Sequence, residues 1–222
     1  MRFKGYSSDL AALIATEIAT QLDRQSRVLW LCSGGSNTLL QVKIMDHLVG
    51  SGVSLEGLTI LAMDERFGES GHPDSNFQQL KQAGFKTGQA TWIDVLAKNL
   101  DFDQTVQNYS NLLKDLTKKS DFTIATFGIG ADGHTAGILP GSAAVDAQQP
   151  VYGYVWQDYV RMTITPNWLV GVDKAFVVAR GQAKLDALSR LKAAASSTAE
   201  LPSMLLNKIK DVVVYTDIKE LL

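Results

Sequence analysis

The side chains best suited to acid–base chemistry lie in a glycine-rich segment, residues 128–142. Asp132 and His134 stand two positions apart there, and an imidazole whose tautomer is fixed by a carboxylate is the commonest general base at neutral pH. The segment follows an apolar run, residues 122–127, whose β-branched and aromatic side chains predict a buried strand. Open α/β sheets bind their ligands at the carboxyl ends of their strands. We therefore interpret the segment as an active-site loop, with His134 as its base.

The glycines of the same segment allow two other interpretations. Gly128, Gly130 and Gly133 match the dinucleotide-binding fingerprint G-x-G-x-x-G, which needs a helix opening at its last glycine and an acidic residue about twenty positions later. Pro140 and Gly141 interrupt any such helix, so we do not expect a dinucleotide. A structural turn with a surface histidine is the other alternative. In an active site, Gly130 and Gly133 would bring the backbone close to the substrate, since glycine tolerates close approach and positive φ.

A second candidate site follows another short apolar run, residues 28–32, which predicts a strand covered on both faces. The run leads into Gly34, Gly35 and Ser36, and apolar residues then recur at helical spacing over residues 38–50. A turn between a strand and a helix amino terminus attracts anions, because its N–H groups are unpaired and the helix dipole is favourable. The turn lacks the lysine of a Walker loop. We expect a phosphate site here, but not one for a nucleoside triphosphate.

Charged residues stand near the ends of further predicted elements. Three of them follow the apolar residues 58–63: Asp64, Glu65 and Arg66. They form either part of the site or a solvated turn with a local ion pair. Arg161 alternates with apolar neighbours in a predicted strand, so one face of that strand could present its guanidinium to the site. Lys184 lies near the start of a predicted helix, where a cation opposes the helix dipole, and this mild cost favours a functional role.

Composition and the order of elements bound the fold class. The chain has 222 residues, of which 45% are hydrophobic and 20% charged, with a formal net charge of −2. This length suits one domain over residues 1–222. Strands alternating with helices predict an α/β fold with a mostly parallel sheet covered on both faces. With a charge so near zero, no basic stripe and no long apolar run, we expect no binding to nucleic acid or membrane.

Cysteine and histidine usage bears on compartment and metals. Cys32 is the single cysteine and lies in an apolar run, so we expect a buried thiol, no internal disulfide and a reducing compartment. The chain does not open with a signal-peptide pattern, which favours a cytoplasmic location. The three histidines have no metal-ligand spacing, so no metal is expected.

Five motifs follow one another between residues 33 and 184: Ser-Gly-Gly-Ser, Asp-Glu-Arg, Gly-x-Gly-x-Asp-Gly-His-Thr-Ala, Arg-x-Thr and Gly-x-x-Lys. Their order resembles that of the 6-phosphogluconolactonase and glucosamine-6-phosphate deaminase superfamily. Residues 132–142 look closest to the lactonase branch, where they usually read DGHTASLFPG. The resemblance implies a Rossmann-like, doubly wound fold and hydrolysis of 6-phospho-D-glucono-1,5-lactone in the pentose phosphate pathway. It implies a small sugar phosphate as partner and no metal or organic cofactor. We expect a monomer or weak homo-oligomer.

The resemblance also implies a role for each matching residue. His134 would activate water, with Asp132 beside it. Arg66, Arg161 and Lys184 look like phosphate-side and substrate-orienting cations. The other candidates for substrate or phosphate binding are turn residues, acidic residues and loop glycines: Gly34, Gly35, Ser36, Asp64, Glu65, Gly130 and Gly133.

Departures from the family pattern leave alternatives open. Asn37 and Thr38 replace the Thr-Pro of the family's Gly-Gly-Ser-Thr-Pro, Gly137 replaces a usual Ser, and the run around Pro166 is a residue short. These changes are compatible with a divergent lactonase or with altered sugar specificity. The deaminase branch resembles DGHIAFNEP, with a Glu before the Pro, whereas this chain has Leu139 there. A non-catalytic sugar-phosphate-binding domain is the remaining alternative, although no evident DNA-binding segment precedes residue 30.

Overall fold

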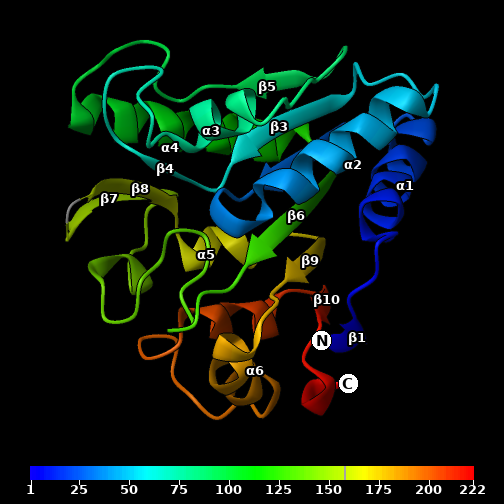
Figure 1. Ribbon diagram of the computed structural model, residues 1–222. Coiled ribbons are helices and arrows are strands. Elements are labelled where there is room, and N and C mark those ends of the chain that lie inside the picture. Colours follow the sequence, from blue (N-terminus) through cyan, green and yellow to red (C-terminus); the bar gives the residue numbers. More distant parts are fainter. Residues whose placement is uncertain (158) are drawn as a thin grey trace.

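The computed structural model describes residues 1–157 and 159–222 and shows an α/β fold built around one large sheet (Figure 1). The sheet has seven strands in the order β1-β10-β9-β6-β2-β3-β5, and each neighbouring pair is parallel. The expected fold class is confirmed. The strands are β1 (Arg2–Gly5), β2 (Val28–Cys32), β3 (Leu58–Ala62), β5 (Thr91–Ile93), β6 (Phe122–Gly128), β9 (Lys174–Val178) and β10 (Asp211–Thr216).

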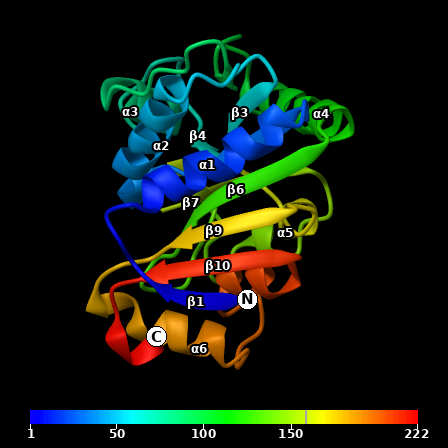
Figure 2. The same ribbon diagram turned by 90° about the vertical axis from the view of Figure 1, so that its right-hand side faces the viewer.

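The chain reverses its direction across the sheet beside β2. From β2 it winds through β3 to β5 at one edge, then returns to β6 on the other side of β2 and continues through β9 and β10. In Figure 2, β6, β9, β10 and β1 can be followed in their order across the sheet. Such a switch leaves a crevice at the carboxyl ends of β2 and β6, where α/β sheets bind their ligands. The loops after β2 and β6 flank this crevice.

Helices cover both faces of the sheet. One face carries α1 (Leu10–Asp23), α2 (Thr38–Gly50) and α3 (Asn76–Gln82), packed around an apolar cluster that includes Trp30 and Phe176. The other carries α4 (Phe102–Lys119), α5 (Pro166–Leu169) and α6 (Leu185–Lys192). Every residue of β2 is buried, as coverage on both sides requires. Its Cys32 is the expected core thiol, and burial raises the pKa of that thiol.

A second, antiparallel sheet is the main feature that the sequence does not predict. It consists of β4 (Asp64–Arg66), β8 (Tyr159–Ile164) and β7 (Val151–Trp156), in that order. Residues 64–66 are therefore a strand, and Arg66 lies directly opposite Arg161. Met63 links the two sheets: its N–H donates to Cys32 O at 2.8 Å, and its carbonyl accepts from the Ile164 N–H at 2.9 Å. Arg66 at the end of β4 is thus held beside Arg161 within β8.

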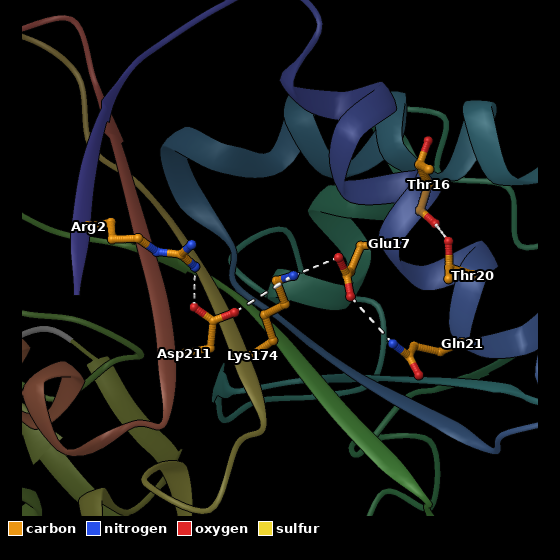
Figure 3. A network of polar contacts seen from close by, with 7 residues as sticks. All are labelled: Arg2, Thr16, Glu17, Thr20, Gln21, Lys174 and Asp211. Atoms are coloured by element: carbon orange, nitrogen blue, oxygen red, sulfur yellow. Dashed lines mark hydrogen bonds and ion pairs between the residues drawn. The ribbon is translucent and has the colours of Figure 1, made fainter.

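A polar network joins the amino ends of β1, β10 and β9 to α1 (Figure 3). Lys174 Nζ lies 2.6 Å from Glu17 Oε2 on α1 and 3.8 Å from Asp211 Oδ2 on β10. Arg2 on β1 pairs with the same aspartate. These residues lie at the end of the sheet opposite the crevice, so the network fixes strand and helix positions and takes no part in the candidate site. Within the described residues, no helix is long and apolar enough to cross a membrane.

Candidate active site

A cavity of about 400 Å³ lies at the crevice between the loops that follow β2 and β6. It brings together nine residues predicted from the sequence: Gly34, Gly35, Ser36, Asp64, Arg66, Gly130, His134, Arg161 and Lys184. They come from five separate segments of the chain, which only the fold brings together. Asp132, Glu65 and Gly133 do not line the cavity, and each has a different place.

Asp132 contacts His134 from outside the cavity. Its Oδ1 lies 2.6 Å from the His134 Nδ1 and accepts the backbone N–H of His134 at 3.1 Å. A carboxylate accepts hydrogen bonds only, so Nδ1 carries the hydrogen and Nε2 is left as the proton acceptor. Partial burial alone would raise the pKa of Asp132, but the hydrogen bonds and electrostatic attraction from His134 outweigh it and hold that pKa below its usual value. The pair has the arrangement of an oriented general base.

Gly130 is required by the position of this imidazole. A Cβ at residue 130 would overlap the His134 ring and the Asp132 carboxylate. The Gly130 N–H donates to His134 O at 2.9 Å, which closes the loop around the pair. The dinucleotide interpretation fails here, because residues 134–142 form a bridge and turns rather than a helix.

Gly133 was predicted to bind substrate, and the structure corrects this. Its φ is +82°, and a Cβ there would overlap Leu201, just before the 3₁₀ helix Pro202–Lys208. Its carbonyl accepts the Ser203 N–H at 3.0 Å. Gly133 therefore packs the loop against the C-terminal part of the chain.

Glu65 is a second correction, because it neither lines the cavity with Asp64 and Arg66 nor lies in a solvated turn. Its side chain is fully buried and does not line the cavity. The carboxylate accepts the backbone N–H groups of Arg66 at 2.8 Å, Asn76 at 2.6 Å and Phe77 at 3.0 Å, and the Ser75 hydroxyl at 3.1 Å. Burial raises the pKa of Glu65 although these hydrogen bonds oppose the rise. Glu65 fastens β4 to the start of α3.

Three cations converge on the cavity. Arg66 and Arg161 face each other across β4 and β8, an arrangement that is unfavourable for like charges unless something offsets their repulsion. The Tyr159 ring lies beneath both, with its centroid 5.6 Å from the Arg66 Cζ and 5.1 Å from the Arg161 Cζ. Aromatic faces attract cations at these distances. Burial and the nearby Arg180 charge lower the pKa of Lys184, the third cation. A bound anionic ligand would offset the repulsion between these three positive charges.

The predicted anion turn differs from a direct strand-to-helix turn. A 3₁₀ helix, η1 (Gly35–Asn37), precedes α2. Gly35 has φ of +65°, and a Cβ at Gly34 would overlap the Asn76 amide. Thr38 occupies the first position of α2, and its backbone N–H and its hydroxyl both donate to Gly35 O, the hydroxyl at 2.9 Å. The proline of the family pattern could form neither hydrogen bond, so the threonine closes the turn in its own way.

The second sheet supports the rest of the loop. The hydroxyls of Tyr154 and Thr163 donate to the carbonyls of Gly137 and Ala136. Gly137 has φ of +69°, and a Cβ there would lie 2.6 Å from the Asp64 Cβ. The glycine that replaces the family's usual serine thus allows Asp64 to pack closely at the cavity wall.

Sequence reasoning missed several wall residues, of which Asn76 is the most informative. It lines the cavity, and its Nδ2 donates to Asp64 O at 2.8 Å. Together, Ser75 and Asn76 predicted a helix start, and Ser75 is the N-cap of α3, accepting the Gln78 N–H at 3.2 Å. The sequence pattern has no signal for the second role of Asn76. Within the described part of the chain, no three His, Cys, Asp or Glu side chains are grouped to hold a metal.

The fold and the cavity define a doubly wound α/β protein with a cationic ligand site and an oriented imidazole. The chain belongs to the glucosamine-6-phosphate isomerase/6-phosphogluconolactonase family, whose model matches residues 4–215. A probable 6-phosphogluconolactonase of Dictyostelium discoideum is 25% identical over 183 residues, 77% of this chain and 76% of that protein.

Solved structures show that both branches of the family share the fold. A 6-phosphogluconolactonase from Shewanella baltica superposes with a TM-score of 0.76 at 22% identity, over 97% of each chain. A monomeric glucosamine-6-phosphate deaminase superposes with a TM-score of 0.81 at 18% identity, over 100% of each chain. The fold therefore does not distinguish a lactonase from a deaminase, and the distinction has to be made from the residues that line the cavity.

Proposed function

We propose that this protein hydrolyses 6-phospho-D-glucono-1,5-lactone to 6-phosphogluconate, a step of the pentose phosphate pathway. The observation that carries the proposal is one cavity that holds an imidazole oriented by Asp132 together with Arg66, Arg161 and Lys184. The cations suit the phosphate dianion, and the imidazole suits the activation of water. We propose further that the protein is a monomer or a weak homo-oligomer.

The proposed reaction needs one base and one anion-stabilising wall. His134 Nε2 takes a proton from water, and the hydroxide adds to the lactone carbonyl carbon. The tetrahedral oxyanion is stabilised by backbone N–H groups of the glycine-rich loop that carries His134, while the cations bind the phosphate. When the intermediate collapses, the bond to the ring oxygen breaks, and the imidazolium returns its proton to that oxygen. The product is the open-chain hydroxy acid, which ionises in water.

Leu139 argues against the deaminase alternative. It lines the cavity at the position before Pro140, where the deaminase-like motif carries a glutamate. Isomerising and deaminating an amino sugar requires several proton transfers, and a leucine cannot move a proton. Hydrolysis of a lactone has no such requirement, so the wall as it stands suits the lactonase.

A pair of assays on the unmodified protein tests the proposal. We expect hydrolysis of 6-phosphogluconolactone above the spontaneous rate, and no ammonia from glucosamine 6-phosphate. Leu139→Glu should not create deaminase activity, because substrate orientation would also have to change. Stoichiometric release of ammonia and fructose 6-phosphate by the unmodified protein would overturn the lactonase assignment. A phosphate-binding protein with no turnover of either substrate would support the non-catalytic alternative instead.

A further inference from the structure

Asn37 occupies a junction between three functional segments. It is the last residue of η1 and is 5% exposed. Its Nδ2 donates to Phe127 O at 3.1 Å and to Val178 O at 3.3 Å. Phe127 lies near the carboxyl end of β6, and Val178 is the last residue of β9. One side-chain amide therefore spans the ends of two neighbouring strands.

These contacts lie where the main-chain pairing of β2 with β6 has ended. The register of β2 with β6 stops at Leu31 and Ala125, whereas that of β6 with β9 continues to Gly128 and Val178. Cys32 still pairs with Ala62 of β3, and beyond it the turn that follows β2 leaves the sheet at the switch point. Asn37 reconnects this turn to the sheet two residues further along β6.

Gly128 leaves the space that the Asn37 side chain occupies. A Cβ at residue 128 would lie 3.1 Å from the Asn37 Nδ2, a tighter approach than side chains normally tolerate. The glycine therefore leaves room for the amide to reach both carbonyls. Threonine, the usual family residue at position 37, has one hydroxyl hydrogen and cannot donate to two carbonyls at once.

The three connected segments carry the three functional groups of the site. The turn Gly34–Ser36 precedes Asn37, the His134 loop follows Gly128, and the segment leading to Lys184 follows Val178. We infer that Asn37 is a positioning residue that sets the placement of the phosphate-binding turn relative to the His134 base. The inference rests on the proposed function and adds to it a residue that contacts no substrate.

The test compares Asn37 variants with a matched control in the same part of the sheet. Asn37→Ala removes both hydrogen bonds, and the nearly isosteric Asn37→Asp turns a carboxylate toward two carbonyls. Thr126→Val removes a buried hydrogen bond from Trp30 Nε1, 3.1 Å long, which also joins β2 to β6 but does not reach the cavity. Melting temperatures identify general destabilisation in each variant.

Turnover of two substrates separates positioning from stability. Phosphogluconolactone is held at both ends, whereas unphosphorylated gluconolactone does not use the phosphate-binding turn. We expect Asn37→Ala to lower kcat for the phosphorylated lactone roughly 10- to 100-fold, the usual effect of misplacing a reacting group. Asn37→Asp should lower this kcat more than Asn37→Ala does, and Asn37→Thr should lower it less. Thr126→Val should keep the wild-type kcat, and gluconolactone turnover should be unchanged throughout. Equal losses for both lactones, or the same loss in Thr126→Val, would overturn the inference.

A measurement without turnover keeps the inference independent of the proposed reaction. Inorganic phosphate added to the wild-type protein should shift the NMR signal of the His134 Cε1–H, because the bound anion lies at a fixed distance from the ring. In Asn37→Ala we expect a different shift at saturation with an unchanged phosphate Kd. An identical shift in the variant would refute the positioning role. If the wild-type protein did not hydrolyse the lactone, the proposed reaction would fail while this comparison still decided the role of Asn37.

Discussion

At the scale of single residues, the chemical type of a side chain indicates candidate site residues better than it indicates the residues that hold them in place. The sequence predicted His134 and its carboxylate correctly as a hydrogen-bonded pair. It assigned Glu65 to substrate binding because an acidic residue after a strand looks like a site residue. The structure shows a buried carboxylate that binds backbone N–H groups. Burial depends on the whole fold and cannot be read from the triplet alone.

The cations give the prediction that belongs to this scale. Arg161→Ala or Lys184→Ala should raise KM for the phosphorylated lactone roughly ten- to a hundredfold, since charge-assisted contacts contribute about 1.5–3 kcal/mol each. Turnover of unphosphorylated gluconolactone should scarcely change. Lys86→Ala, which lies outside the cavity, is the control. Steady-state kinetics with both lactones measures the effect. An equal loss of catalytic efficiency with both would show that the cations stabilise the fold or take part in the chemical step.

At the scale of elements, strand ends must be held together for the cavity to form. The amino ends of β2 and β6 are joined just before the strands begin: the Arg27 guanidinium donates to both oxygens of Asp121, at 3.1 and 3.0 Å, and its backbone N–H donates at 2.9 Å. These hydrogen bonds from the side chain and backbone of Arg27 lower the pKa of Asp121 to about 2. Asn37 provides the corresponding connection at the carboxyl ends.

The lowered pKa of Asp121 predicts how stability depends on pH. A carboxyl whose pKa is depressed by folding stabilises the folded state above its unfolded pKa, and this contribution disappears as the pH falls through the folded value. Asp121→Asn should therefore melt at a lower temperature than wild type near neutral pH. The difference should shrink as the pH falls from about 4 toward about 2.

Thermal unfolding of both proteins across that pH range measures the effect. Asp23→Asn serves as the control, because within the described residues its carboxylate forms no ion pair. A difference between wild type and Asp121→Asn that stayed constant down to the lowest pH would contradict the linkage.

At the scale of the whole molecule, the sequence predicts the parallel sheet but not the second one. Continuous apolar runs mark β2, β3, β6, β9 and β10, because strands covered on both faces must be apolar. β5 has three residues and β1 is mostly exposed, so neither has such a run. Residues 64–66 pair with residues 161–163, a distant contact that no local pattern encodes. The position of Arg66 opposite Arg161 therefore had to come from the structure.

The most direct test of the central claim is the background-corrected rate of 6-phosphogluconolactone hydrolysis by wild type and His134→Ala. We predict catalysis by the wild-type protein and a kcat lower by roughly 10²- to 10⁴-fold in His134→Ala, the usual contribution of a general base. KM should change little, because the cations remain. His47→Ala, at the far end of α2, should match wild type. A folded His134→Ala protein with wild-type turnover, or a wild-type protein no faster than the spontaneous reaction, would contradict the account.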